Sequence, residues 1–330
     1  MTGARDPLRR LAPVVRLAPA KLNLTLAVTG TRSDGFHALH TVMMPLGLAD
    51  RLSVAPSPSP GDTLHVDGFD PGPAASNLVL RAIAAVRRAV EPEPAPALAV
   101  RLEKRIPVAA GLAGGSSDAA AAIDAALEAW AHRLEPAVHF TIAASLGSDV
   151  PFFLAGGAAL VEGRGERVTP LVGLRGPPPG ILLVAPDVPL ATPDVFAAWD
   201  GGARAELLGA ARQASEHFAA ELGSGMSVGT LLERAAVLAA SNDLLPAAAI
   251  LVDGLVPFRR ALFRLLARPI GLSGSGPTLW AIYSSPDAAE EAAMRVRDAI
   301  GGGDLVAPGA GPPLIIATTT PTSPHGGSPG

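Results

Sequence analysis

The chain is organised around residues 107–118, Pro-Val-Ala-Ala-Gly-Leu-Ala-Gly-Gly-Ser-Ser-Asp. They follow a segment in which Leu98, Val100 and Leu102 alternate with other residues, as in a β-strand, and they precede an alanine-rich run over 119–130 that is typical of a helix. Glycine lets the backbone take positive φ and approach a ligand closely. The free N–H groups and the dipole of a helix N-terminus favour an anion. We therefore predict that this loop binds phosphate; a tight strand–helix connection that needs small residues is the alternative.

The loop differs from the two best-known nucleotide-binding loops. It lacks the Gly-Lys-Ser/Thr ending of a Walker A loop and the G-x-G-x-x-G spacing of a dinucleotide fingerprint, which argues against an NAD-type dehydrogenase. Ser116 and Ser117 stand at the predicted helix start. Hydroxyl groups there can cap the helix, contact phosphate oxygens or ligate Mg²⁺.

Composition limits the classes of protein to which the chain can belong. Its 330 residues carry a net charge of −4 and are 48% hydrophobic, which allows a sizeable core and argues against a nucleic-acid partner. No run of about 18 apolar residues is present, so we expect no membrane partner. The absence of cysteine excludes disulfides, thiolate metal sites and a cysteine nucleophile. We expect a cytoplasmic protein that is a monomer or a weak homodimer.

Strand-like and helix-like segments alternate along the chain without an internal repeat. Strands cluster early and helices are interleaved later, which favours an α+β fold over a regular parallel βαβ array. Residues 1–13 are expected to form a flexible leader, and residues 319–330, rich in Thr, Ser, Pro and Gly, a disordered tail. The Pro-Pro-Pro-Gly stretch at 177–180 is the expected boundary region between two halves.

Only two of the 26 basic residues are lysines, Lys21 and Lys104, which makes each a weak indicator of a site that needs a compact ammonium group. Lys21 and Asn23 share one face of an extended segment whose other face is apolar. An exposed polar face is the simple interpretation; if the face is covered, Lys21 needs an acidic partner. For Lys104 the simple interpretation is a surface strand residue.

Asp149 lies in Gly-Ser-Asp-Val-Pro-Phe-Phe (147–153), between a predicted helix end and an apolar run. The local pattern favours an N-cap for a short helix over 150–154, because proline is preferred in the first helical turn. The alternative is a carboxylate that accepts a substrate hydroxyl proton in apolar surroundings.

Two further turns carry candidate ligand contacts. Ser-Asp-Gly-Phe-His (33–37) places Phe36 and His37 at the end of a turn, where they can bind a planar ring by stacking and hydrogen bonding; ordinary packing is the alternative. The glycine-rich segment 271–278, Gly-Leu-Ser-Gly-Ser-Gly-Pro-Thr, is typical of a hairpin connection.

Taken in order, these motifs resemble those of the GHMP kinases, the superfamily of galactokinase and of the homoserine, mevalonate and phosphomevalonate kinases. The resemblance covers most of residues 14–318. Its two N-terminal motifs place the chain nearest to the branch that acts on a cytidyl-linked methylerythritol. The matching segments are Pro-Ala-Lys-Leu-Asn-Leu (19–24), Asp-Gly-Phe-His (34–37), the loop and helix start (107–120), Leu-Gly-Ser-Asp-Val-Pro-Phe-Phe (146–153), Ser-Asn-Asp-Leu (241–244) and the second glycine-rich turn (271–278).

The resemblance implies a two-domain α+β kinase with an N-terminal ATP-binding domain over 14–172, a C-terminal domain over 173–318 and the active site in the cleft between them. It implies ATP as phosphoryl donor, Mg²⁺ as its companion and a small-molecule cytidyl substrate. The residues expected to wrap the ATP phosphates are Pro107, Val108, Ala109, Ala110, Gly111, Leu112, Ala113, Gly114, Gly115, Ser116 and Ser117, of which Ser117 is also a candidate Mg²⁺ ligand.

The same resemblance implies roles for single residues. Asp149 matches the catalytic aspartate, which accepts or orients the hydroxyl proton, and Lys21 matches its partner lysine, which keeps Asp149 ionised and offsets charge on the phosphoryl group. His37 matches the residue that reads the polar edge of cytosine, and Phe36 a ring that stacks on it. Further substrate contacts are expected at Asn23 and, as a second stacking ring, at Phe196.

The chain departs from the family pattern in two places. Phe36 stands where tyrosine is common, which keeps the stacking and loses a hydroxyl hydrogen bond. Ala109, Ala110 and Ala113 stand where glycine is common, and alanine fits easily only where φ is negative.

Two other functions share this fold. Another GHMP kinase, acting on mevalonate or homoserine, is the first alternative, and Phe36 with His37 argues against it. A non-catalytic nucleotide-binding protein is the second, and the presence of both Lys21 and Asp149 argues against that.

Overall fold

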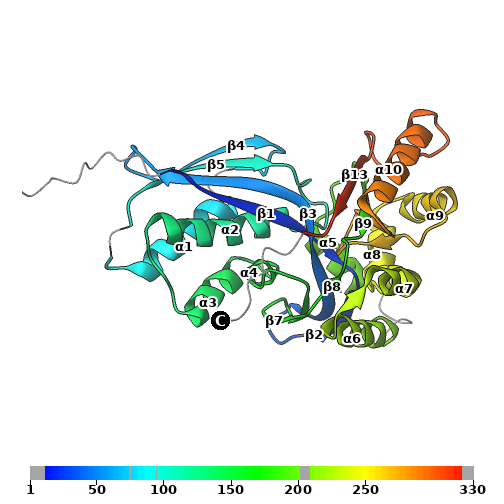
Figure 1. Cartoon of the computed structure of the whole chain (residues 1–330), viewed down its shortest axis with the longest axis horizontal. Helices are drawn as coiled ribbons and strands as arrows, with labels where there is room; N and C mark the ends of the chain where they lie inside the picture. Colours follow the sequence, from blue (N-terminus) through cyan, green and yellow to red (C-terminus); the bar gives the residue numbers. More distant parts are fainter. Residues whose placement is uncertain (1–11, 74–75, 94, 201–208, 322–330) are drawn as a thin grey trace, which may run out of the picture.

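The computed structural model describes residues 12–73, 76–93, 95–200 and 209–321 (Figure 1). The predicted leader (1–13) and tail (319–330) therefore fall mostly outside the described residues. A seven-stranded sheet comes from the first half of the chain, and a four-stranded sheet from the second half. Both sheets are mainly antiparallel with helices packed on them, which confirms the predicted α+β fold.

One long strand organises the larger sheet. β3 (His37–Pro56) runs for 20 residues and pairs antiparallel with four other strands. These partners are β1 (Val14–Asn23), β2 (Ala27–Thr31), β5 (Leu98–Lys104) and β6 (Ala159–Gly163). The sheet is extended by β4 (Thr63–Gly68), parallel to β5, and by β7 (Arg167–Pro170), antiparallel to β6.

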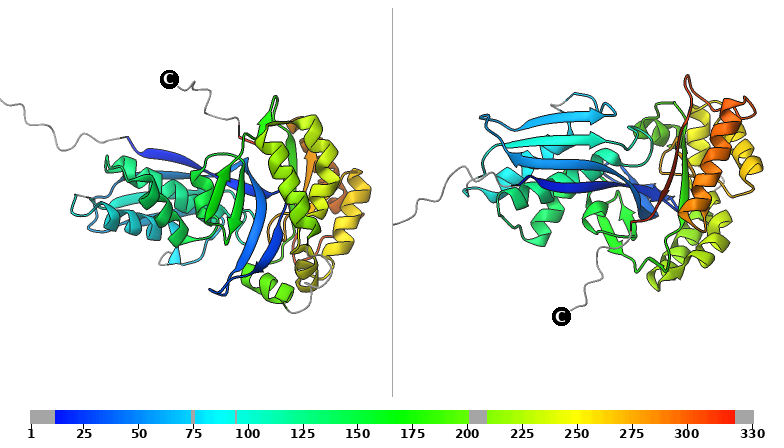
Figure 2. Two further views of the ribbon diagram at one scale, coloured as in Figure 1. Left: turned by 90° about the horizontal axis from the view of Figure 1, so that it is seen from below. Right: turned by 45° about the horizontal axis from the view of Figure 1, so that its top comes forward.

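Helices cover one face of this sheet, as Figure 2 shows. They are α1 (Leu78–Val90), α2 (Gly114–Ala129), α3 (Pro136–Leu146) and α4 (Val150–Leu154). Their apolar residues form one core with Leu52 and Val54 of β3. The N-cap of α1 is Asn77, whose Oδ1 accepts a hydrogen bond from the N–H of Val79 at 2.9 Å. The preceding Ser76 does not cap the helix, and its Oγ donates instead to the carbonyl oxygen of Pro73 at 3.0 Å.

The smaller sheet is covered on both faces. Its order is β11 (Gly271–Leu272), β12 (Leu279–Tyr283), β9 (Gly180–Ala185) and β13 (Leu314–Thr319). Every residue of β9 is buried, because helices lie on each side. One side packs on α8 (Leu245–Leu251), α9 (Leu255–Leu266) and α10 (Pro286–Gly301). The other side packs on α6 (Ala210–Gly223) and α7 (Val228–Ala240).

Three short elements complete the described chain. β8 (Leu174–Arg175) and β10 (Met226–Ser227) form a small parallel pair, and α5 (Thr192–Ala198) follows β9. Within the described residues, no helix is long and apolar enough to cross a membrane.

A shared core joins the two sheets and fixes the loop at 107–113 between them. Leu22 of β1 and Met44 of β3 belong to the same buried cluster as Ile181 and Ile282 of the smaller sheet, and Leu112 of the loop lies in it too. Leu112 is therefore an anchor of the loop, and its neighbours in the sequence are held at the junction of the two halves.

Candidate active site

The loop that precedes α2 takes an unusual backbone path. Ala109, Gly111 and Ala113 have φ of 54°, 75° and 54°. A Cβ on Gly111 would overlap the carbonyl oxygen of Ser273, so only glycine fits where the two glycine-rich turns meet. A left-handed alanine costs on the order of 1 kcal/mol. The predicted difficulty with alanine thus applies to Ala109 and Ala113, whereas Ala110 is not among the residues with positive φ.

A cavity of about 410 Å³ opens beside this loop and the start of α2. Nine of the eleven loop residues expected at ATP line it; Leu112 and Ser117 do not. Leu112 is in the core, and Ser117 is buried with no hydrogen-bond partner for its Oγ among the residues described. Of the two serine hydroxyls in the loop, the one that faces the cavity is that of Ser116.

The far wall of this cavity was not predicted. It comes from the segment that leads into α1, some thirty residues before the loop, and consists of Pro71, Ser76, Asn77 and Leu78. No pattern in the sequence links that segment to the loop. The contact exists because α1 and α2 pack side by side on the same face of the sheet.

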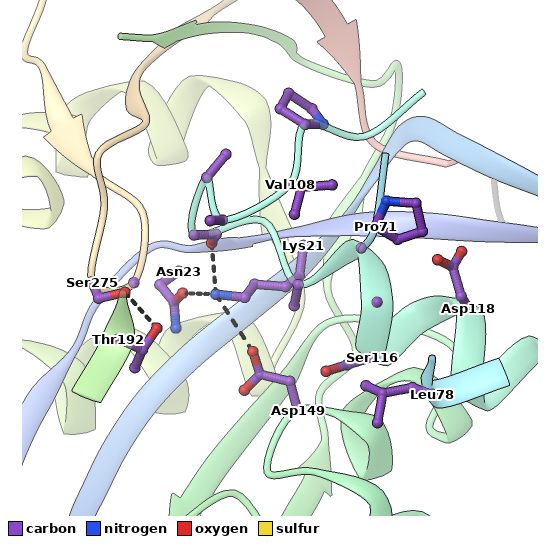
Figure 3. A pocket seen from close by; sticks show the side chains of 18 of the residues that line it. Lys21, Asn23, Pro71, Leu78, Val108, Ser116, Asp118, Asp149, Thr192 and Ser275 are labelled. Atoms are coloured by element: carbon purple, nitrogen blue, oxygen red, sulfur yellow. Dashed lines mark hydrogen bonds and ion pairs between the residues drawn. The ribbon is translucent and has the colours of Figure 1, made fainter. Parts of the chain in front are cut away.

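Lys21 reaches into the cavity from β1 and holds the loop (Figure 3). Its Nζ donates hydrogen bonds to Asn23 Oδ1 at 2.5 Å and to the carbonyl oxygen of Gly111 at 2.8 Å, and it lies 3.8 Å from Asp149 Oδ2. Burial lowers the pKa of Lys21, and the Asp149 carboxylate opposes that shift. The polar face predicted for this strand is therefore covered, and Lys21 has the acidic partner that burial requires.

Asp149 precedes α4 at its N-cap position, but its side chain makes no capping hydrogen bond. The cap interpretation, which the local sequence favoured, is wrong for the side chain. The carboxylate is instead partly exposed, at 29%, and faces both the cavity beside the loop and a second cavity.

The second cavity, of about 560 Å³, contains Phe36, His37 and Phe196. The His37 and Phe196 rings stack at 4.6 Å with an interplanar angle of 15°. Nε2 of His37 lies 2.9 Å from Asp200 Oδ1. Phe36 is half exposed, and Cζ of Arg164 lies 5.3 Å from its ring centroid. The structure thus gathers the three predicted ring residues and adds Asp200 and Arg164, which the sequence analysis missed.

The second glycine-rich turn, between β11 and β12, contacts the loop and Lys21 and supports them. Ser273 Oγ donates to the Gly111 carbonyl at 3.0 Å, and a Cβ on Gly274 would lie 3.1 Å from Lys21 Nζ. Nδ2 of Asn242, in the Ser-Asn-Asp-Leu segment, donates to the carbonyls of Leu272 and Gly274. Both motifs therefore act on the site through the backbone that supports the loop.

Lys104 is not a surface residue, and that interpretation of the sequence was wrong. Its Nζ, almost fully buried, donates to Asp50 and, at 2.6 Å, to Asp118 Oδ2. Asp50 Oδ1 also accepts from the N–H of Ile106 at 2.8 Å, which ties the chain to β3 just before the loop. Burial raises the pKa of Asp118 to about 7; the Asp50 charge adds to this shift and Lys104 opposes it.

Comparisons with known proteins agree with this geometry. Sequence profiles of the GHMP kinases N terminal domain and of the GHMP kinases C terminal region match residues 77–157 and 218–300. A crystal structure of homoserine kinase from Cytophaga hutchinsonii, 16% identical, superposes with a TM-score of 0.65 over 97% of this chain and 98% of that one. The chain has the two family domains and the fold of a GHMP kinase.

Relatives with higher sequence identity show which family of GHMP kinases the chain belongs to. The 4-diphosphocytidyl-2-C-methyl-D-erythritol kinases of Pelotomaculum thermopropionicum and Methylorubrum extorquens are each 38% identical over 86% of this chain and 94% of their own length. A crystal structure of a 4-(cytidine 5'-diphospho)-2C-methyl-D-erythritol kinase, 32% identical, has a TM-score of 0.68 and covers 94% of this chain and 100% of that one. The chain belongs to the family of 4-diphosphocytidyl-2-C-methyl-D-erythritol kinases.

Proposed function

We propose that this protein transfers the γ-phosphoryl group of ATP to the 2-hydroxyl of 4-diphosphocytidyl-2-C-methyl-D-erythritol, a step in the non-mevalonate route to isoprenoid precursors. The observation that carries the proposal is that the two cavities meet at Asp149, with Lys21 Nζ 3.8 Å from its carboxylate. One cavity has the phosphate-binding features and the other has the aromatic rings. The names of the relatives supply the substrate.

Positioning and charge account for the chemistry at this junction. The ATP phosphates lie along the loop, where the N–H groups of the first turn of α2 and the Lys21 ammonium offset their charge. Asp149 orients the acceptor hydroxyl and takes its proton as the phosphoryl group transfers. Phosphoryl transfer asks little covalent chemistry of the protein, so this small set suffices.

The second cavity holds the cytosine. When Nε2 of His37 donates to Asp200, Nδ1 of the neutral ring is an acceptor, which suits the exocyclic amino group of cytosine. Phe36 and Phe196 supply the flat apolar surfaces. Asn23 holds Lys21 and also donates from Nδ2 to Thr41 Oγ1 at 2.9 Å, so its contacts favour a role in orienting Lys21, and its predicted contact with the substrate stays a prediction.

Mg²⁺ accompanies ATP in this proposal. Oxygen atoms are its preferred ligands, but the Oγ of Ser117 is buried and Ser117 does not line the cavity beside the loop, so its predicted role as a Mg²⁺ ligand stays a prediction. Bound beside the phosphates, the ion would neutralise their charge. The cytoplasmic location and the monomeric or weakly dimeric state stay predictions from the sequence.

An ATP-consumption assay with three acceptors tests the proposal. We expect turnover with 4-diphosphocytidyl-2-C-methyl-D-erythritol and none with mevalonate or homoserine. The Asp149→Asn variant, nearly the same in shape, is the control and should be inactive with all three. A preference for mevalonate or homoserine would overturn the assignment of the substrate, and turnover by the variant would overturn the role of Asp149.

A further inference from the structure

Arg164 lies in the turn that joins β6 to β7, and its side chain lines the second cavity together with Asp149. Gly163 and Gly165 flank it with φ of 70° and 129°. A Cβ on Gly165 would overlap the carbonyl oxygen of Ser148, so the turn packs directly on the backbone that leads into Asp149. The two glycines therefore hold Arg164 near the point where the two cavities meet.

The guanidinium of Arg164 has no ion-pair partner in the part of the chain that the structure describes. It donates to the carbonyl of Ala144 at 3.2 Å and lies over the Phe36 ring. Glu166, the carboxylate in the same turn, is bound to Arg32 at 3.0 Å and accepts from the backbone N–H of Arg164 at 2.6 Å. The positive charge of Arg164 is thus left for the cavity.

The other charges of the cavity make this cation necessary. Among the residues described there, Asp149 and Asp200 are carboxylates, while Arg164 is the only lysine or arginine. The proposed acceptor carries a diphosphate between its cytidine and its methylerythritol. Such an anion would be repelled by the two carboxylates unless a cation binds it, and the planar guanidinium matches phosphate oxygens in pairs.

We propose that Arg164 binds the diphosphate of the acceptor substrate and thereby directs the acceptor hydroxyl toward Asp149. This inference rests on the proposed function and adds to it a residue that reads the phosphate part of the substrate. His37 and the rings bind one end of that substrate, Asp149 meets the other, and Arg164 holds the middle.

Calorimetry with CDP and with cytidine isolates the diphosphate. A non-hydrolysable ATP analogue fills the nucleotide site, and the two ligands are titrated into the unsubstituted protein and into Arg164→Gln. We expect the substitution to lower the affinity for CDP about 10- to 100-fold, the range of a charge-assisted hydrogen bond, and to leave the affinity for cytidine unchanged. In turnover, the KM of the acceptor should rise by a similar factor, whereas the KM of ATP stays constant. Arg164→Lys should recover part of the affinity.

Arg167→Gln is the matched control, because Arg167 is three residues further on, two-thirds exposed, paired with Glu162 and absent from the cavity wall. It should bind CDP normally. Unchanged CDP binding in Arg164→Gln would overturn the proposal, as would equal losses for CDP and cytidine, which would mean that Arg164 only supports the Phe36 ring. Failure of the proposed function looks different: the unsubstituted protein would not phosphorylate the cytidyl substrate.

Discussion

The two lysines of the chain are both buried, yet their surroundings differ. Lys21 Nζ donates to two neutral oxygens, and its one carboxylate, on Asp149, is 3.8 Å away and partly exposed. Lys104 Nζ lies between two carboxylates, on Asp50 and Asp118, that are both almost fully buried. The charge of Lys104 is fully paired, whereas that of Lys21 remains available to an anion in the cavity.

The contrast separates the cation that we propose to be catalytic from a structural one. A buried ammonium needs compensation, and Lys104 receives it from the protein itself. Lys21 receives only part from the protein, and the phosphoryl group of a bound nucleotide would supply the rest. The same criterion singles out Arg164, a cation of the second cavity that has no ion-pair partner among the described residues.

Replacing Lys21 by methionine should have the largest effect on activity. Methionine keeps the apolar stem and removes the charge, so we expect the rate of phosphoryl transfer to fall about 1,000-fold or more, roughly 4 kcal/mol of barrier. The midpoint of thermal unfolding should change little, because the buried charge that is lost was only partly compensated. Steady-state kinetics and calorimetry check this. A variant that keeps a tenth of the rate would remove Lys21 from the catalytic set.

Replacing Lys104 by methionine should instead reduce stability. Two buried carboxylates would remain without their cation, and breaking such a buried pair costs about 3 kcal/mol or more. Urea unfolding measures the loss. The neighbouring Arg105→Met is the control: Arg105 is exposed and pairs with Glu103 at the surface, so its removal should cost less than about 0.5 kcal/mol. Equal losses in both variants would contradict the structural role of Lys104.

The sequence was informative where a pattern is local. The loop predicted to bind phosphate, the alanine-rich helix after it, and the polar face of Lys21 and Asn23 were each predicted from residues close together in the chain. The strand–loop–helix order led us to predict an anion site, with a tight strand–helix connection that needs small residues as the alternative.

Sequence reasoning failed where distant elements meet. Asp50, Lys104 and Asp118 come from β3, β5 and α2, and nothing near Lys104 in the chain shows that its strand face is covered. Asp149 resembles a cap locally, and only its distance to Lys21, 128 positions upstream, reveals the alternative. In the sequence, Arg164 stands in an ordinary hairpin turn. Only the structure shows that Gly165 packs against the backbone of Ser148 and so brings this turn next to Asp149.

The smallest effect is expected in the loop, where each of the two lysines lies close to one glycine. Lys21 binds the Gly111 carbonyl, Lys104 Nζ would lie 3.1 Å from a Cβ on Gly114, and the left-handed Ala113 stands between them. Ala113→Gly relieves roughly 1 to 2 kcal/mol of backbone strain. The substitution also raises the conformational entropy of the unfolded chain, which lowers the stability by about 0.4 to 1 kcal/mol. We therefore expect a gain in stability of about 1 kcal/mol or less, measured by urea unfolding.

Ala110→Gly is the matched control three residues earlier. Ala110 is not among the residues with positive φ, and its buried methyl group belongs to the core that joins the sheets. Glycine at this position raises the entropy of the unfolded chain and removes apolar contacts, so we expect the free energy of unfolding to fall by about 1 kcal/mol. Opposite signs for the two substitutions would show that the loop holds Ala113 in a strained conformation, because relief of strain is the one stabilising contribution and only Ala113→Gly has it. If both substitutions destabilise equally, the left-handed conformation of Ala113 carries no strain, and the loop rests in its preferred shape.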